Sequence, residues 1–225
     1  MAELEPLRLE EHAPSTLQHH FRTMDQQRDA SSLAMWVFLV TEILFFGAFF
    51  LTYMIYRWQY SRGFAHASLH MDVMLGTTNT AVLIVSSLTM AMAVHSAATG
   101  RRRLLLGFLS ATIVLGFAFL GIKAVEYADH IRHHLLPGPG FRYPGPDGPA
   151  AQMFFSLYFG MTGLHALHMI VGIGIMTTLL VMSYRGRFSP EYYTPVEVSG
   201  LYWHFVDIVW IFLFPLLYLI GRHLK

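Results

Sequence analysis

Glu42 is a carboxylic acid within an otherwise apolar stretch, residues 33–56. It lies about nine residues into that stretch, which is about 14 Å along a helix. An ionised acid at mid-membrane costs roughly 2.5–3.5 kcal/mol, so such a group stays protonated or finds a hydrogen-bond donor. Glu42 is therefore a candidate for proton handling or for contact with a lipid headgroup. The alternative is a hydrogen-bonded packing residue.

Lys123 and Glu126 form a second pair of ionisable residues. Their spacing of three places them on one helical face, where they can form an ion pair. Because Lys123 and Glu126 lie near the end of an apolar stretch, their charged groups could reach the membrane–water interface at little cost. We favour a structural role for this pair over a functional one.

Two histidines and an acid follow the same spacing in later apolar stretches. His165 and His168 are three residues apart, as are His204 and Asp207. Three histidines on neighbouring helices could bind haem or a metal, but no carboxylate or cysteine completes a metal shell at a usual spacing. Hydrogen bonds between helices are the favoured interpretation, and we predict no catalytic residue and no metal site.

These side chains require a scaffold that spans a membrane. The chain is 54% hydrophobic and 13% charged, whereas soluble domains carry roughly 25% charged residues, and its mean hydropathy is +0.45. Stretches of about 20 apolar residues predict transmembrane helices. The sequence predicts an all-α polytopic bundle, residues 33–225, behind a polar tail, residues 1–32, with five spans: 33–56, 73–97, 104–127, 151–184 and 201–220.

The connections between the spans are short except for residues 128–150. That segment is rich in proline and glycine, so we expect an exposed loop without helix. No internal repeat suggests a transporter with inverted halves. Most histidines outside the spans are expected on solvated surface: His12, His19, His20, His66, His70, His130, His133, His134 and His223.

Charge and composition restrict the setting and the partners. Eight Lys or Arg residues lie in the tail and in the connections after the second and fourth spans. Six lie on the opposite side, around the connections after the first and third spans and at the C-terminus. This excess favours a cytoplasmic N-terminus and an outer C-terminus. No signal peptide is expected in the tail. A net charge of +1 argues against a nucleic-acid partner, and the lack of cysteine excludes disulfides and iron–sulfur clusters.

Five segments, in order, resemble the cytochrome c oxidase subunit III family, over about residues 33–222. Residues 36–47 (WVFLVTEILFFG) resemble the family's segment around its buried glutamate. The spans that follow are similar through these features: Asn79-Thr80 with Ser86-Ser87 and His95-Ser96, Leu115-Gly116 with 123–127 (KAVEY), 162–168 (TGLHALH) and 202–210 (YWHFVDIVW). This chain resembles the five-span bacterial form, and Ala166 stands where the family usually has glycine.

The resemblance implies an accessory subunit of an aerobic haem-copper terminal oxidase, without a redox centre of its own. Such a subunit packs on subunit I, with subunit II and a small subunit IV as further partners, in a bacterial inner membrane with a periplasmic C-terminus. It binds phospholipid, supports proton uptake and slows inactivation during turnover. Haem and copper are expected in the partner subunits.

The resemblance also implies roles for individual residues. Glu42 takes the place of the family's buried glutamate, and Arg185 is a candidate contact for a lipid headgroup. An intramembrane polar network is expected from these side chains: Asn79, His95, Lys123, Glu126, His165, His168, His204 and Asp207.

Several alternatives stay open. The electron donor could be cytochrome c or quinol, and the accessory protein of a nitric oxide reductase is a close variant. A haem-binding electron carrier that uses His165, His168 and His204 is a second class of function. A small transporter or channel is a third.

Overall fold

The computed structural model describes residues 21–145 and 147–221. Five helical segments are long and apolar enough to cross a membrane, which confirms the predicted five-span all-α bundle: α1 (Met24–Gln59), α3 (Val73–Ala98), α4 (Arg102–Arg132), α5 (Gly148–Tyr184) and Thr194–Leu219. The last span consists of α6 (Thr194–Phe214) and a π-helical turn, η1 (Pro215–Leu219). Residues 1–20 of the predicted tail, with His12, His19 and His20, lie outside the described residues, as does His223.

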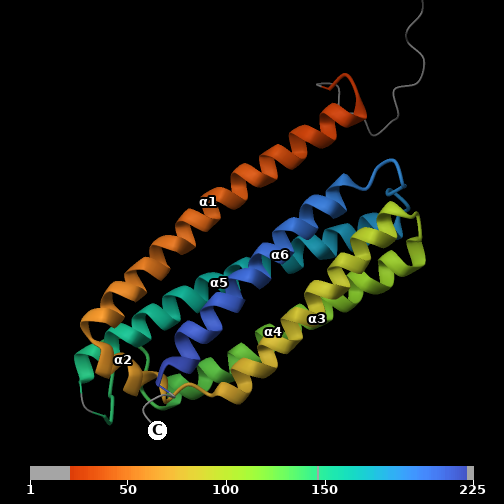
Figure 1. The fold of residues 1–225 in the computed structure, drawn as a ribbon. Helices are drawn as coiled ribbons and strands as arrows, with labels where there is room; N and C mark the ends of the chain where they lie inside the picture. Colours follow the sequence, from red (N-terminus) through yellow and green to blue (C-terminus); the bar gives the residue numbers. More distant parts are fainter. Residues whose placement is uncertain (1–20, 146, 222–225) are drawn as a thin grey trace, which may run out of the picture.

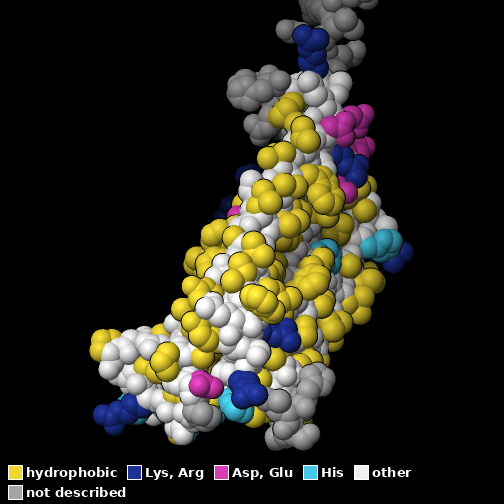
Figure 2. All heavy atoms as spheres, turned by 60° about the vertical axis from the view of Figure 1, so that its left-hand side comes forward, with side chains coloured by type: hydrophobic (Ala, Val, Ile, Leu, Met, Phe, Trp, Pro, Cys, Tyr) yellow, Lys and Arg dark blue, Asp and Glu magenta, His cyan; other side chains and the backbone are white. Residues whose placement is uncertain are grey.

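The bundle has a layered arrangement. Figure 1 shows α1 along one side, α5 and α6 in the middle, and α3 with α4 on the opposite side. The ends of successive spans alternate, so that the connections α3–α4 and α5–α6 lie at the end where α1 begins. Apolar side chains cover most of the long face in Figure 2, and charged side chains gather mainly towards the two ends. This is the surface expected of a membrane-spanning protein.

Local chemistry sets several helix boundaries. The Thr23 hydroxyl accepts a hydrogen bond of 3.2 Å from the Gln26 amide at the start of α1. The Asp72 carboxylate accepts bonds of 2.8 and 3.1 Å from two amides in the first turn of α3. Gly100 and Gly186 follow α3 and α5 with φ of +70° and +72°, a left-handed conformation that glycine adopts at little cost.

Helix α1 packs through a narrow stripe. Within its apolar part the buried residues are Leu39, Phe46 and Tyr53, seven residues apart, which is the spacing of a single helical seam. The remaining surface of α1 is largely exposed, including Leu44 at 69%. At its N-terminal end, Arg28 and Glu197 of α6 form an ion pair of 3.1 Å.

Glycines allow close approach around the central tryptophans. A Cβ atom at Gly172 of α5 would lie 2.7 Å from the ring of Trp203 in α6, and one at Gly116 of α4 would lie 3.1 Å from the same ring. The Trp203 indole N–H donates to the Ser86 hydroxyl of α3 at 3.0 Å. Trp203 therefore ties four spans together around one fully buried side chain.

The helices of the structure extend beyond the predicted apolar stretches. Helix α1 begins at Met24, so part of the expected tail is helical. A short helix, α2 (Ser61–Ser68), occupies the first connection and contains His66. Helix α4 continues to Arg132 and α5 begins at Gly148, so the prediction of a wholly non-helical segment over residues 128–150 was wrong. The reason is that the proline- and glycine-rich sequence starts only after residue 136.

Candidate functional site

Glu42 of α1 meets His168 of α5. Its carboxylate oxygen Oε2 lies 3.1 Å from His168 Nε2, and the two side chains are 18% and 15% exposed. Glu42 reaches His168 because it is three residues after Leu39 and four before Phe46, on the buried stripe of α1. The Phe46 ring packs against the imidazole at a centroid distance of 5.2 Å.

The hydrogen bonds of His168 fix how many protons the pair shares. Its Nδ1 lies 2.9 Å from the carbonyl oxygen of Leu164, an atom that can only accept. Nδ1 therefore carries a hydrogen, and Nε2 and Glu42 are left to share one further proton. That proton makes either an acid beside a neutral imidazole or a carboxylate beside an imidazolium, and the net charge is zero in both cases.

The pair sits at the edge of the bundle, close to the surface that faces the membrane. Ile43, Leu44 and Phe45, which follow Glu42, are all exposed. On the inner side, the Tyr202 hydroxyl donates to the His168 carbonyl at 3.0 Å. The Glu42–His168 pair therefore lies between the helices of the bundle on one side and the membrane-facing apolar surface on the other.

Lys123 and Glu126 form a second, sealed polar cluster. Lys123 Nζ lies 2.9 Å from Glu126 Oε2, and the side chains are 4% and 2% exposed. The ammonium also donates to the hydroxyls of Tyr158 and Tyr218, at 3.0 and 2.9 Å. Both tyrosines in turn donate to Glu126 Oε1, at 2.9 and 2.6 Å.

The expectation that Lys123 and Glu126 reach the interface was wrong. Helix α4 continues well beyond the apolar stretch, and Trp210 and Tyr127 enclose the ammonium, each with its ring centre 5.2 Å from Nζ. A buried ion pair is tolerable when its remaining donors and acceptors are also paired. Here every hydrogen of the ammonium has an oxygen partner, so the cluster is suited to holding α4, α5 and η1 together.

His165 occupies a different environment from His168, although the two are only three positions apart in the sequence. It is 1% exposed, and neither ring nitrogen has a partner in the described part of the chain. Its ring packs between Phe119 and Trp210, at 5.4 and 5.2 Å. The nearby Asn79 amide donates to the Phe119 carbonyl at 3.5 Å. The structure places His165 in the aromatic core and His168 at the α1 interface.

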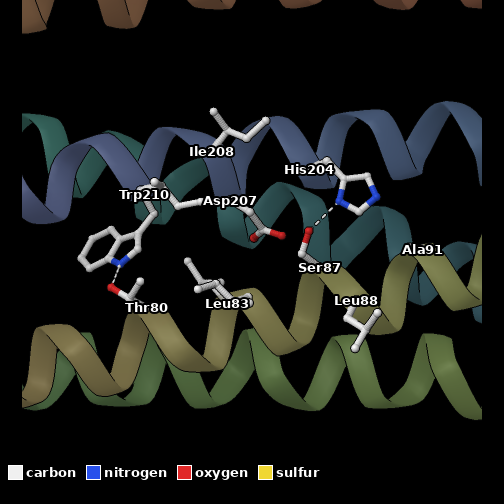
Figure 3. Close-up of a pocket in the computed structure, with 11 residues that line it drawn as sticks. Thr80, Leu83, Ser87, Leu88, Ala91, His204, Asp207, Ile208 and Trp210 are labelled. Carbon is white, nitrogen blue, oxygen red and sulfur yellow. Dashed lines mark hydrogen bonds between the residues drawn. The ribbon is translucent and has the colours of Figure 1, made fainter.

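His204 and Asp207 line a groove between α3 and α6, shown in Figure 3. His204 Nδ1 lies 2.7 Å from the Ser87 hydroxyl. Asp207 is 3% exposed and lies beside the Ser87 hydroxyl, although neither carboxyl oxygen makes a well-aligned hydrogen bond in the described residues. His204 therefore faces Ser87 and is not joined to His168, so the three histidines considered as haem ligands have separate neighbours.

The last two predicted residues lie near helix ends. His95 is exposed in the last turn of α3, and Arg185 is the exposed C-cap of α5. Arg102, not Arg185, binds the end of α5, donating to the carbonyls of Ser183 and Tyr184. Neither His95 nor Arg185 joins the polar groups of the interior.

Three polar side chains of the interior were not anticipated. His130 was expected at the surface, but it is 3% exposed and its Nδ1 lies 2.7 Å from the Glu126 carbonyl. Tyr158 and Tyr218 complete the Lys123 cluster. A tyrosine about seven residues inside an apolar stretch, as Tyr158 is, requires a partner for its hydroxyl. That requirement could have indicated the buried cluster from the sequence.

Comparison with known proteins identifies relatives over more than four-fifths of the chain. A family model described as cytochrome c oxidase subunit III matches residues 142–222. Cytochrome bo(3) ubiquinol oxidase subunit 3 of Pseudomonas aeruginosa is 31% identical, over 83% of each chain. Quinol oxidase subunit 3 of Bacillus subtilis is 30% identical, over 84% of this chain and 86% of its own.

A relative of the other oxidase type has a similar sequence identity. Cytochrome c oxidase subunit 3 of Gadus morhua is 33% identical, over 82% of this chain and 67% of its own. The five spans and the relatives of both types agree with the resemblance seen in the sequence. The chain therefore belongs to the haem-copper oxidase subunit III family, as a multi-pass membrane protein and a subunit of a multi-subunit oxidase.

Proposed function

We propose that this chain is a non-catalytic accessory subunit of an aerobic terminal oxidase, packed on subunit I and binding phospholipid. Subunit II and a small subunit IV are the further partners. In this role the chain supports proton uptake and slows inactivation during turnover. Haem and copper belong to the partner subunits, and this chain contributes no redox centre.

The observation that carries the proposal is the Glu42–His168 pair. It joins α1 to α5 at 3.1 Å and shares one proton at the edge of the bundle. With the shared proton the pair is neutral, so a low-dielectric region can accommodate it, and a carboxyl group beside an imidazole can pass a proton from one partner to the other. Its position beside exposed apolar residues also suits contact with bound lipid.

A quinol-fed oxidase is a second candidate for the assembly. The chain matches more than four-fifths of two quinol oxidase subunits, but about two-thirds of the vertebrate cytochrome c oxidase subunit. The two quinol oxidase subunits among the relatives support this candidate. The donor is decided by assaying the purified complex with reduced cytochrome c and with ubiquinol in parallel.

The proposed setting is the inner membrane of a bacterium, with the N-terminus in the cytoplasm and the C-terminus in the periplasm. The excess of arginine at the end where α1 begins supports this orientation. It places Arg185 on the cytoplasmic side, at the depth of lipid headgroups. The Glu42–His168 pair would then lie within the membrane, below that surface.

Purification in mild detergent tests the assembly. We expect haem-bearing subunits to copurify with this chain. A chain that isolates alone, with a haem spectrum that disappears when His165, His168 or His204 is changed, would instead support the electron-carrier alternative. Flux of solute through vesicles that contain this chain alone would support a transporter.

Replacement of Glu42 tests its role in the assembled oxidase. We expect Glu42→Gln to leave the haem spectra and the initial turnover in place, because the amide can still donate to His168 Nε2. Activity should decline faster during sustained turnover, because the amide cannot release a proton. Thr52→Val is the matched control, since the Thr52 hydroxyl bonds only within α1, to the Ala48 carbonyl at 2.8 Å. Loss of the haem spectra in Glu42→Gln would contradict the proposal.

A further inference from the structure

The groove between α3 and α6 holds a buried acid that the role of Glu42 does not use. The groove has a volume of about 400 Å³, and Asp207, Ser87 and His204 form its polar centre (Figure 3). Asp207 is 3% exposed, and its carboxyl group lies beside the Ser87 hydroxyl, but neither oxygen makes a well-aligned hydrogen bond within the described chain. Buried polar groups in membranes are normally paired, because no water is there to replace the partner.

The neighbours within the chain cannot fully satisfy Asp207. Ser87 has one hydroxyl hydrogen, and its oxygen is already 2.7 Å from His204 Nδ1. If His204 donates in that bond, the Ser87 hydrogen is free to turn towards one oxygen of Asp207. The second oxygen would still lack a donor. One oxygen of Asp207 is therefore left open to a hydrogen-bond donor from outside this chain.

The depth of Asp207 restricts the source of that donor. The last span runs from Thr194 to Leu219, so Asp207 lies about 20 Å from one end and about 18 Å from the other. Ser87 is similarly central in α3. Phospholipid headgroups lie at the surfaces of a hydrocarbon core about 30 Å thick. An acyl chain can reach Asp207, but it carries no donor.

The walls of the groove suit another helix. Ile84 and Leu88 on α3, and Ile208 and Ile211 on α6, are all about half exposed and run along both helices on either side of the polar centre. Ala91 is a small residue in the same wall. Small residues permit close helix approach in membranes, and side-chain hydrogen bonds across the contact add stability.

We propose that the α3–α6 groove is the docking site for a transmembrane helix of a partner subunit, and that a hydrogen-bond donor on that helix binds Asp207. The donor would be a hydroxyl, amide or cationic side chain at mid-membrane. This proposal rests on the assembly inferred above, because it needs a second membrane-spanning subunit. It adds a contact surface between α3 and α6, formed by other residues than the Glu42–His168 pair.

Photocrosslinking in the complete oxidase identifies the occupant. A benzophenone amino acid replaces Leu88, which is 62% exposed in the groove, and in a control it replaces Val114, which is 65% exposed on α4. We expect Leu88 to give an adduct with one transmembrane segment of another subunit. Adducts with lipid or quinol alone at Leu88 would overturn the proposal, as would an equal yield of the same protein adduct at Val114.

Asp207→Leu tests the hydrogen bond through two readouts that should move in opposite directions. The isolated chain should keep or raise its unfolding temperature, because an unpaired buried acid is removed. The assembled oxidase with Asp207→Leu should lose this subunit more readily in detergent. An oxidase with Asp207→Asn, which keeps one oxygen acceptor, should retain more of the subunit than one with Asp207→Leu. A lowered unfolding temperature with unchanged retention would mean that Asp207 acts only within the chain, and would overturn the proposal.

The two proposals fail in different ways. If the unmodified chain never copurifies with haem-bearing subunits, the assembly itself is wrong. If it copurifies but the Leu88 probe finds no protein, only the docking site is wrong.

Discussion

The Tyr53 hydroxyl of α1 donates a hydrogen bond of 2.5 Å to the main-chain carbonyl of Leu216. Leu216 lies in the π-helical turn η1, directly after Pro215. Proline has no amide hydrogen, so regular helix hydrogen bonding is interrupted there, and π-helical turns are common at such interruptions. The irregular end of the last span is therefore stabilised from outside, by a side chain of the first.

Tyr53→Phe should weaken the attachment of α1 to the end of the last span. The ring still fills its site, but the Leu216 carbonyl loses a donor, and we expect a loss of about 1 kcal/mol. Thermal unfolding of the purified chain in detergent measures the change. Tyr56→Phe is the control on the same helix, because the Tyr56 hydroxyl has no hydrogen bond to the described chain and its ring, which stacks on Tyr60, is kept by phenylalanine. Equal effects of the two changes would argue against a role for the Tyr53–Leu216 bond.

Gly172→Ala should destabilise the centre of the bundle, whereas Gly174→Ala should not. A Cβ atom at Gly172 would lie 2.7 Å from the Trp203 ring, whereas one at Gly174 meets nothing within 4 Å. At Gly172, overpacking of the filled core costs roughly 1–3 kcal/mol. At Gly174, only the higher helix propensity of alanine remains, which favours the folded state by about 1 kcal/mol. The same unfolding assay compares the two variants, and a Gly172→Ala protein as stable as the Gly174→Ala protein would contradict the close approach of α5 and α6.

Lys123→Met should be more damaging than the double change Lys123→Met with Glu126→Gln. The single change leaves Glu126 buried without its cation, at a cost of roughly 3–5 kcal/mol. The double change removes both charges and keeps an acceptor for the Tyr158 and Tyr218 hydroxyls. Unfolding of the three proteins in detergent gives the order, and a double variant no more stable than the single one would show that the ion pair is not the source of the effect.

The five spans could be predicted because apolar length is a direct consequence of bilayer thickness. Where each helix ends could not be predicted in the same way. Helix α4 continues past its apolar stretch because Lys123, Glu126 and His130 are enclosed by aromatic residues from α5, α6 and η1. Their burial depends on partners that are about 30 to 95 residues away in the sequence, so it has no local signal.

The candidate site was predictable in part for the same reason. The cost of an acid in the membrane singled out Glu42, and the helical spacing singled out His168. Their contact depends on the packing of α1 against α5, which the sequence of either helix alone does not specify. The spacing of His165 and His168 predicts a shared helix face. Three residues turn the helix by about 300°, so the two side chains point about 60° apart, and the packing places them in separate environments.

The narrow stripe on α1 has a consequence for how this helix can vary. Glu42 and Tyr53 are its two polar attachments to the bundle within the apolar part, and eleven residues correspond to about three complete turns. One residue inserted between them would rotate one attachment by about 100° away from its partner. Outward-facing positions such as Leu44 and Leu51 can exchange one apolar side chain for another without touching either contact. Helix α1 should therefore tolerate apolar substitutions on its outer side but no insertion or deletion between residues 42 and 53.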